Sequence, residues 1–249
     1  PLSTLIQAGI SDILIITTPE DQSAFQRLLG DGSQFGIRLT YAVQQRPEGL
    51  AQAFIIGADF IGDSSVALAL GDNIFHGSQF SASLSQCRDP QGGIVFAYEV
   101  SDPSRYGVVA FDESGQALSI VEKPQHPQSN FAVVGLYFYD NSVVDIAHTI
   151  TPSARGELEI TSVNEEYLRR GKLQVQKLTR GDVWLDTGTF DSMSEASSYV
   201  EVLQKRTGII IGSPEAAAYQ SGFIDAEQLQ ILAARLDKSG YGKLLRNIL

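Results

Sequence analysis

The chain has 249 residues, 43% of them hydrophobic and 19% charged, which is the composition of a folded domain rather than of a disordered or fibrous protein. Its 18 basic and 29 acidic side chains leave a formal net charge of −11, which excludes a footprint for a nucleic-acid polymer but is compatible with a compact site for a small phosphate. A single cysteine, Cys87, excludes an intrachain disulfide and favours a reducing compartment, and no apolar run reaches the roughly 20 residues that a membrane helix needs.

The first third of the chain alternates helical patterns with short β-branched apolar runs. These elements follow one another at residues 2–10, 12–17, 18–29, 37–43, 50–60 and 65–70. The third of them begins with Thr-Pro-Glu-Asp, a helix start, and Phe25, Leu28 and Leu29 form its apolar stripe. The apolar runs at 12–17 and 65–70 are typical of parallel strands buried on both faces. We therefore expect a Rossmann-like α/β core with a mostly parallel sheet.

The rest of the chain has a different rhythm. Strands with little helix between them are predicted at 93–100, 108–111, 117–121 and 131–139. A hairpin-like turn joins two of them, so we expect a mixed or antiparallel sheet added to the core. Helices are predicted at 142–150, 157–170 and 190–206, with a strand at 173–179 and a helix with a capping box at 225–228 near the end. The expected organisation is a domain of residues 1–212 with a C-terminal helical segment, residues 213–249, that belongs to it.

Two aspartates follow predicted strands. Asp72 lies at the carboxyl end of a strand, where ligands bind in open α/β sheets. Asp186 lies between a strand and the helix that begins near Phe190. Mg²⁺ prefers one or two carboxylates together with waters and substrate phosphates, so the two would form a metal site if the fold brings them together. The alternative for each is an aspartate that only shapes a turn or favours a helix start.

Basic side chains that suit a phosphate occur in two places. Lys123 follows Glu122 and precedes a proline that holds the pair extended. The lysine would neutralise a phosphate and the glutamate would accept hydrogen bonds from sugar hydroxyls. Arg155 stands at the start of a predicted helix, against the preference of the helix dipole, which suggests an anionic ligand. The alternatives are an exposed ion pair and a solvated arginine.

Glycines offer two further places where a ligand can approach the backbone. Gly49 and Gly107 are such positions, although either can also serve only a turn or a helix start. No phosphate loop of the form G-x-x-x-x-G-K-[ST] and no G-x-G-x-x-G fingerprint occurs in the chain. An ordinary P-loop or dinucleotide-binding protein is therefore disfavoured.

Eight short motifs in order give the chain a family resemblance. They are V-Q at 43–44, E-G-L-A-Q-A at 48–53, L-G-D-N-I-F at 70–75, D-P-x-R-Y-G-V-V at 102–109, E-K-P at 122–124, G-L-Y-F-Y-D at 135–140, P-S-x-R-G-E-L-E-I-T at 152–161 and W-L-D-T-G-T at 184–189. No motif is decisive alone. Together, over residues 1–249, they resemble the glucose-1-phosphate thymidylyltransferases, a family of sugar-nucleotide nucleotidyltransferases.

The resemblance implies an Mg²⁺-dependent transfer of a thymidylyl group from dTTP to α-D-glucose 1-phosphate, in which the sugar phosphate attacks the α-phosphorus in line and pyrophosphate leaves. Carried over residue by residue, it implies Mg²⁺ ligands at Asp72 and Asp186. The implied nucleotide-binding residues are Gln44, Gly49 and Asp72. The implied sugar-phosphate-binding residues are Tyr106, Gly107, Glu122, Lys123, Val133, Tyr137 and Arg155. The implied catalytic residues are Asp72, Asp186, Lys123 and Arg155.

The resemblance also concerns the setting of the enzyme. It implies a cytoplasmic homotetramer that supplies dTDP-glucose for dTDP-rhamnose and related cell-surface sugars. The C-terminal helical segment would contribute to subunit contacts and to feedback control by a dTDP-sugar.

One departure from the family pattern concerns the start of the chain. Family members carry a first buried strand, a glycine-rich G-x-G-T-R loop and a P-K pair upstream of the position that matches Pro1. The loop wraps the triphosphate, and its basic residues neutralise charge at the reacting phosphate. We therefore expect these 249 residues to be a fragment of a longer protein that is unstable and inactive when expressed alone.

Three alternatives stay open on the sequence. A sister nucleotidyltransferase would use UTP, CTP or another sugar phosphate, and competition among nucleoside triphosphates distinguishes it. A metal-dependent glycosyltransferase usually carries an Asp-x-Asp motif, which Asp72 and its neighbours do not form. A non-catalytic protein that keeps the sugar pocket would bind glucose 1-phosphate without releasing pyrophosphate.

Overall fold

The structure is a computed structural model that describes residues 1–249. Its helices are α1 Leu2–Gln7, α2 Gln22–Leu29, α3 Gln52–Ile56, α4 Ala58–Ile61, α5 Ser78–Leu84, α6 Val143–Thr149, α7 Ile160–Arg169, α8 Phe190–Thr207, α9 Pro214–Gln220, α10 Ala226–Arg235 and α11 Tyr241–Arg246. Its strands are β1 Asp12–Thr17, β2 Arg38–Val43, β3 Val66–Ala69, β4 Asn73–His76, β5 Gly93–Glu99, β6 Gly107–Phe111, β7 Ala117–Glu122, β8 Phe131–Tyr139, β9 Leu173–Lys177 and β10 Val183–Asp186. None of the helices is long and apolar enough to span a membrane.

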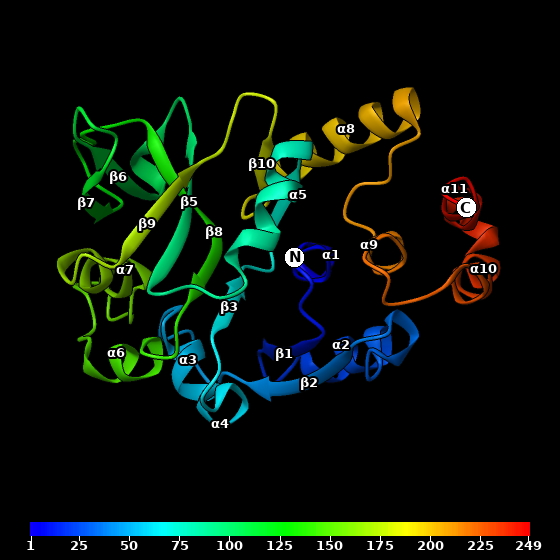
Figure 1. Ribbon diagram of the computed structural model, residues 1–249, viewed down its shortest axis with the longest axis horizontal. Helices are drawn as coiled ribbons and strands as arrows, with labels where there is room; N and C mark the ends of the chain where they lie inside the picture. Colours follow the sequence, from blue (N-terminus) through cyan, green and yellow to red (C-terminus); the bar gives the residue numbers. More distant parts are fainter.

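The strands form one large sheet and two separate pairs (Figure 1). The large sheet has the order β7-β6-β8-β5-β9, with β3 as an additional partner of β8. In it β5 and β9 are parallel, whereas β8 runs antiparallel to β3, β5 and β6. β1 and β2 form a parallel pair, and β4 and β10 form an antiparallel pair. The predicted α/β class, with an added mixed sheet and a C-terminal helical segment, is confirmed.

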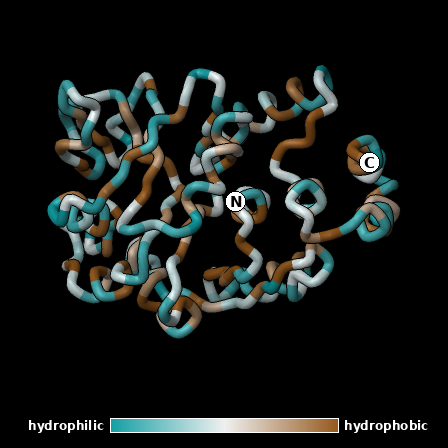
Figure 2. The backbone as a smooth tube through the Cα atoms, viewed as in Figure 1, coloured by the Kyte–Doolittle hydropathy of each residue, from teal (hydrophilic) through white to brown (hydrophobic).

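The N-terminal and C-terminal elements of the chain together form one hydrophobic core, the terminal core. α1, β1, β2 and the helices α9 to α11 bury a cluster that includes Ile6, Leu39, Ala217, Leu229 and Leu245. Asp225 caps α10, since its carboxylate accepts the Gln228 N–H at 2.8 Å, but the predicted capping box is not completed, because the Gln228 side chain donates to the Gln34 carbonyl instead. Figure 2 shows the hydrophobic residues 209–211 that lead from α8 to this core. The C-terminal segment therefore packs on the N-terminal elements rather than on the large sheet.

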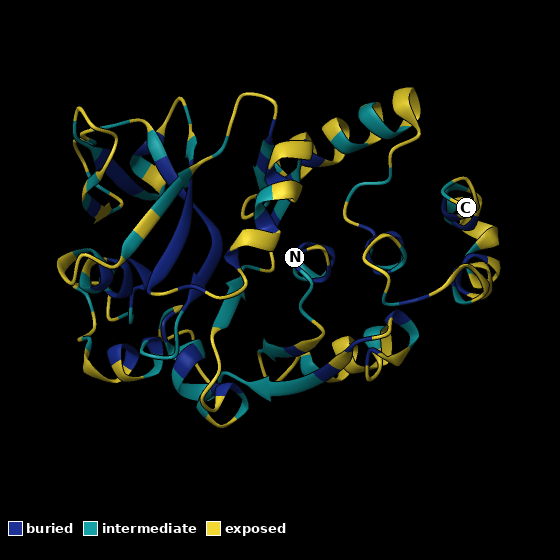
Figure 3. Cartoon of the chain, in the orientation of Figure 1, coloured by how far each residue is buried: buried dark blue, intermediate teal, exposed yellow.

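The second core surrounds β8, the longest strand. Its sequence FAVVGLYFY is buried except at the first residue, and Figure 3 shows most of β5 and β8 buried. A continuous apolar run suits a strand covered on both faces. Helices α3, α6 and α7 cover one face, and α5 with the β4–β10 pair covers the other. The strand ends that border the site are held in place by this packing.

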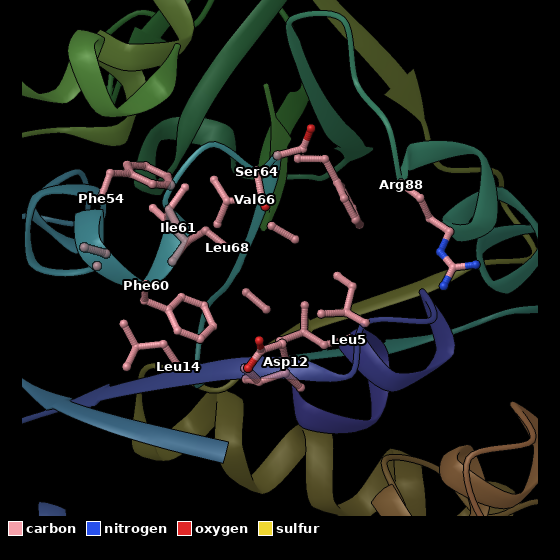
Figure 4. A pocket seen from close by; sticks show the side chains of 18 of the residues that line it. Leu5, Asp12, Leu14, Phe54, Phe60, Ile61, Ser64, Val66, Leu68 and Arg88 are labelled. Atoms are coloured by element: carbon pink, nitrogen blue, oxygen red, sulfur yellow. The ribbon is translucent and has the colours of Figure 1, made fainter. Parts of the chain in front are cut away.

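β1 and β3 border an apolar cavity of about 410 Å³. Leu14, Phe60 and Leu68 lie around it, from β1, α4 and β3 (Figure 4). Each of the two strands has a single partner, β2 for β1 and β8 for β3, so its second edge is unpaired. The prediction that both strands are buried on both faces is therefore wrong, and only Ile13 among their residues is buried.

Two helix predictions also need correction. The helix predicted at 18–29 begins only at Gln22, because the Thr18 hydroxyl accepts the Asp21 N–H at 3.2 Å and closes a turn first. Only Leu29 of its apolar stripe packs against a core, since Phe25 and Leu28 are 40% and 73% exposed. The helix predicted at 50–60 is split at Gly57 into α3 and α4. β4 and α5 have no counterpart among the predicted elements, because four and seven residues carry little periodicity.

Candidate functional site

The site opens where two strands stop along one edge of β8. β3 pairs with residues 136–139 of β8, and β6 pairs with it at Ala132, so residues 133–135 are left between them. A pocket of about 490 Å³ lies over this gap. Eight of the predicted site residues line it: Asp72, Tyr106, Gly107, Glu122, Lys123, Val133, Tyr137 and Asp186. The structure thus gathers residues from five strands and their ends at one place.

Asp72 and Asp186 come together because β4 and β10 pair antiparallel. The register places Asp186 opposite Asn73, the residue after Asp72. Thr187 then donates two hydrogen bonds to the carbonyl oxygen of Asp72, from N at 2.9 Å and from Oγ1 at 2.8 Å. A methyl group at Gly188 would lie 3.1 Å from Asp186 Oδ1 and 3.4 Å from Asp72 Oδ2. The two carboxylates therefore border one small space that only glycine leaves open.

Asn73 holds the Asp72 carboxylate in place. Its side chain, 3% exposed, accepts hydrogen bonds at Oδ1 from the Gly135 N–H at 2.9 Å and from the Trp184 indole at 2.6 Å. Its Nδ2 donates to Asp72 Oδ1 at 2.7 Å. Since Asn73, Gly135 and Trp184 belong to β4, β8 and β10, one buried amide ties the carboxylate to three strands.

Asp186 has two polar neighbours from the segment before β6. The Tyr106 hydroxyl donates to Asp186 Oδ2 at 3.2 Å, and the Arg105 guanidinium lies 3.9 Å from the same oxygen. The Tyr106 ring meets the Trp184 ring edge to face, with centroids 5.0 Å apart. Burial raises the pKa of Tyr106, and the negative charge of Asp186 raises it further. Tyr106 therefore remains a neutral hydrogen-bond donor at physiological pH.

The donor set around Gly188 fits Mg²⁺. Two carboxylates that face one space match the ligand count that Mg²⁺ takes from proteins, since it completes its octahedron with waters and substrate phosphates. The chain has no group of three or more His, Cys, Asp or Glu side chains that could hold a metal ion. The geometry thus suits a metal shared with a phosphate ligand rather than a closed structural site.

Glu122 and Lys123 enter the pocket from the end of β7. Glu122 Oε2 accepts a hydrogen bond from the Thr161 hydroxyl, and the Lys123 N–H donates to the Tyr106 carbonyl at 3.0 Å. Lys123 has φ 40°, the one positive φ outside glycine. The prediction that Pro124 holds this pair extended is therefore wrong at Lys123. Left-handed backbone at a lysine is strained, and such strain clusters at ligand sites.

Arg155 lies beside the pocket for a different reason from the one predicted. It belongs to a loop, because α7 begins only at Ile160. The prediction that Arg155 stands at the start of a helix is therefore wrong. Its guanidinium faces three carboxylates, those of Glu157 at 2.8 Å, Glu159 at 3.4 Å and Glu122 at 3.7 Å. A phosphate that binds Arg155 has to compete with these carboxylates.

Gln44 and Gly49 are hydrogen-bonded to each other at the rim of the pocket, next to the lining residue Leu50. Gln44 Nε2 donates to the Gly49 carbonyl at 3.2 Å and to Gln52 Oε1 at 2.6 Å. Gly49 has φ 106°, and a Cβ there would lie 2.4 Å from Leu158 backbone atoms, so only glycine fits. Leu50 lines the pocket, whereas Gln44 and Gly49 do not. The two residues predicted to bind the nucleotide therefore lie next to the pocket rather than inside it.

The floor is formed by alternate residues of β8. Val133, Gly135 and Tyr137 face the pocket, as the period of two in a strand requires. Burial raises the pKa of Tyr137, and the charge of Glu122 adds to this, so its hydroxyl is neutral. Five lining residues with polar side-chain atoms have no role in the sequence analysis: Asn73, Arg105, Thr161, Asn164 and Trp184. All of them except Asn164 stand inside quoted motifs, which is a usable signal.

Comparison with known proteins agrees with this geometry. A family model described as "Nucleotidyl transferase" matches residues 1–202. The chain is 59% identical over 249 residues to a glucose-1-phosphate thymidylyltransferase of Mycolicibacterium smegmatis, covering 100% of this chain and 86% of the relative. It is 54% identical over 250 residues to the enzyme of the same name from Neisseria gonorrhoeae, covering 100% of this chain and 87% of the relative.

Solved structures give the same answer for the fold. A crystal structure of a Bacillus anthracis protein with this family name superposes with a TM-score of 0.72 at 37% identity, covering 80% of this chain and 79% of that one. A UDP-glucose pyrophosphorylase bound to UDP-glucose superposes with a TM-score of 0.68 at 23% identity, covering 81% and 87%. The second likeness concerns the fold alone.

Proposed function

Because the chain belongs to the nucleotidyl transferase family and, within it, to the glucose-1-phosphate thymidylyltransferases, we propose that it transfers a thymidylyl group from dTTP to α-D-glucose 1-phosphate. The products are dTDP-glucose and pyrophosphate. The observation that carries the proposal is the pairing of Asp72 and Asp186 around Gly188, at a pocket that also holds Lys123. This places carboxylates and a cation where phosphate groups would meet.

The sugar phosphate is assigned to the floor of the pocket. Gly107 leaves the backbone open there, since a methyl group would lie 3.1 Å from Thr161 Oγ1 and 3.4 Å from Glu122 Oε2. Glu122 would accept hydrogen bonds from sugar hydroxyls, and Val133 and Tyr137 would pack against the ring. The phosphate would lie between Lys123, which lines the pocket, and Arg155, which lies beside it and contacts Glu122.

The nucleotide is assigned to the rim. Gln44 and Gly49 would contact the thymine edge, because a side-chain amide offers a donor and an acceptor and the glycine lets a base approach the backbone. The reaction would take place between the two parts of the site, next to Asp72. Residues from the β3–β4 turn, the end of β7 and the end of β10 line one space here.

The proposed chemistry is a single in-line displacement. A sugar phosphate oxygen forms a bond to the α-phosphorus of dTTP, the bond from that phosphorus to the bridging oxygen breaks, and pyrophosphate leaves with the electron pair. No proton transfer is needed, because the attacking oxygen is already anionic. Lys123 and Arg155 would hold the nucleophile in line and offset its charge, which is a matter of positioning and electrostatics.

Mg²⁺ is the proposed cofactor, held by Asp72 and Asp186. When bound, it supplies positive charge that draws electron density from the phosphate oxygens. Asn73 and Thr187 would keep the two carboxylates in place, since they fix the side chain and the main chain of Asp72. Tyr106 would orient Asp186 in the same way, since its hydroxyl donates to Oδ2 of that carboxylate.

The full-length protein with dTTP, glucose 1-phosphate and Mg²⁺ tests the proposal by phosphorus NMR. We expect dTDP-glucose and pyrophosphate in equal amounts, turnover with UTP slower by at least about tenfold, and loss of turnover in Asp72→Asn but not in the control Asp59→Asn on exposed α4. Faster turnover with UTP or CTP would instead identify a sister nucleotidyltransferase. Binding of glucose 1-phosphate without release of pyrophosphate would identify a binding protein.

We also propose a homotetramer. The support from this chain is α8, on which Phe190, Met193 and Val202 are 95%, 54% and 58% exposed, so that the helix carries several large apolar residues that a partner subunit would cover. Figure 3 shows most of α8 exposed or half-buried. Sedimentation velocity at micromolar concentration tests this, and a monomer at all concentrations would contradict it.

The remaining proposals concern the setting. A cytoplasmic location is supported by the single free thiol, which is buried at Cys87. A role in supplying dTDP-rhamnose precursors follows from the proposed product. Deletion of the gene, followed by measurement of dTDP-glucose and dTDP-rhamnose in the cell extract, tests the second point, and unchanged pools of both would contradict it.

A further inference from the structure

Asn164 is the one residue of the pocket with a buried polar atom that has no partner. Its side chain is 1% exposed, and Nδ2 makes no hydrogen bond. The other buried side-chain atom of this kind in the chain is Thr40 Oγ1 in β2, which does not line the pocket. Because buried donors are nearly always satisfied, an unpaired donor in the wall of a ligand pocket indicates that its partner arrives with the ligand.

The orientation of this amide is set by its other end. Asn164 Oδ1 accepts a hydrogen bond from the Tyr139 hydroxyl at 2.6 Å. Tyr139 is itself held between two parallel rings, with centroid distances of 6.2 Å to Tyr137 and 5.2 Å to Tyr167. The ring of Tyr139 is thus held in place. Because its hydroxyl occupies Asn164 Oδ1, Nδ2 is the free end of the amide.

The position of Asn164 along α7 indicates which part of the ligand it meets. It lies one helical turn after Thr161, on the same face, and the Thr161 hydroxyl donates to Glu122. Arg155, assigned to the phosphate, precedes the helix and also contacts Glu122. Asn164 therefore lines the pocket one helical turn further along α7 from the Arg155 loop than Thr161, on the side that we assign to the sugar hydroxyls.

We propose that Asn164 is a specificity-determining residue whose Nδ2 donates a hydrogen bond to one hydroxyl oxygen of the bound sugar. The proposal rests on the proposed function, since the sugar phosphate is the ligand. Nδ2 donates but cannot accept, so the pocket would favour a sugar with an oxygen at that position over one that lacks it. Discrimination by a buried donor arises because a ligand without the oxygen leaves that donor unpaired.

Binding of deoxygenated ligands tests the proposal. Calorimetry would give Kd values of the full-length protein and Asn164→Leu for glucose 1-phosphate and its 2-, 3-, 4- and 6-deoxy analogues. We expect the variant to bind glucose 1-phosphate about tenfold more weakly, yet to match the wild type on one deoxy analogue. Thr40→Val, which removes the other unpaired atom, serves as the matched control and should leave all five Kd values unchanged. Asn164→Asp keeps an acceptor for Tyr139 and, when ionised, has no donor, so the same loss of discrimination is expected, together with a lower melting temperature because the carboxylate is buried.

The outcomes separate this inference from the proposed function. Equal weakening of all five ligands in both Asn164 variants, or no weakening, would overturn the role of Asn164. A wild type that binds and discriminates among the analogues while Asn164→Leu keeps the same pattern would overturn it as well. A wild type that does not bind glucose 1-phosphate at all would overturn the proposed function and the inference with it.

Discussion

Thr187 binds one carbonyl oxygen of Asp72 with both its N–H and its hydroxyl, across 115 positions of sequence. The residue after one carboxylate is thereby fastened to the main chain of the other. Because the β4–β10 register sets this contact, the proposed metal site depends on the strand pair more than on either loop. The proposed metal site can therefore be tested by substituting neighbouring residues while Asp72 and Asp186 are kept.

Gly188→Ala is expected to weaken metal binding without unfolding the protein. The added methyl group would lie 3.1 Å from Asp186 Oδ1 and 3.4 Å from Asp72 Oδ2, in the space assigned to the ion. We expect Mn²⁺ affinity to fall at least about tenfold by calorimetry, with a small change in melting temperature. Gly181→Ala is the control, because its methyl group would come no closer than 3.9 Å to another atom. Equal Mn²⁺ affinity in the two variants would contradict the assigned position of the ion.

Asn73→Leu is expected to cost stability rather than only activity. The substitution leaves the Gly135 N–H and the Trp184 indole buried without an acceptor, which costs about 1–3 kcal/mol for each group. Urea unfolding should therefore show a loss of at least about 2 kcal/mol. Asn141→Leu, which removes hydrogen bonds in an exposed loop, should cost less than about 1 kcal/mol. Comparable losses in both variants would show that Asn73 does not join the three strands.

Arg105→Gln is expected to tighten metal binding. Its guanidinium lies 3.9 Å from Asp186 Oδ2 and competes with a cation for that carboxylate. Because Arg105 is half-exposed, the screened effect should be small, about threefold in the Mn²⁺ dissociation constant at low salt and less at high salt. Arg246→Gln, which breaks an ion pair with Asp237 away from the pocket, should have no effect. Weaker Mn²⁺ binding in Arg105→Gln would mean that this arginine supports the site instead.

Because of the cavity beside β1, we expect two leucine-to-alanine substitutions in neighbouring strands to lower the free energy of unfolding by different amounts. Leu14 borders the cavity, whereas Leu39 of β2 is buried in the terminal core. Leu39→Ala should cost about 2–5 kcal/mol in the free energy of unfolding. Leu14→Ala should cost less than about 1.5 kcal/mol, because part of its side chain has no packing partner to lose. Urea unfolding measures both free energies, and a larger cost for Leu14→Ala would show that the cavity is filled in solution.

Much of the fold is predictable because the patterns are local. The four middle strands match β5 to β8 within two residues, since their runs are apolar and a turn separates β6 from β7. Strand partners are a different matter. The antiparallel pairing of β3 with β8 joins segments about 70 residues apart, and no local pattern specifies it. Phe25 and Leu28 of α2 are exposed although Leu29 packs on a core, which shows that amphipathic spacing alone does not reveal which apolar residues have a partner.

Part of the site is also predictable from the sequence. Asp72 and Asp186 follow from the rule that ligands bind at strand ends, and the pocket brings them together. Arg155 lies next to the pocket although the helix-dipole reason was wrong, because the start of α7 is set by packing of Ile160 rather than by its first polar residues. Asn164 could not be found, since its role depends on a tyrosine stack that forms only in the folded chain.

A manganese titration of the wild type, Asp72→Asn, Asp186→Asn and the double variant, followed by electron paramagnetic resonance, tests most directly whether two aspartates form one metal site. We expect each single substitution to weaken Mn²⁺ binding by at least about tenfold and the double variant to bind little more weakly than either. Wild-type affinity in Asp186→Asn, or losses that add fully in the double variant, would contradict a single shared site.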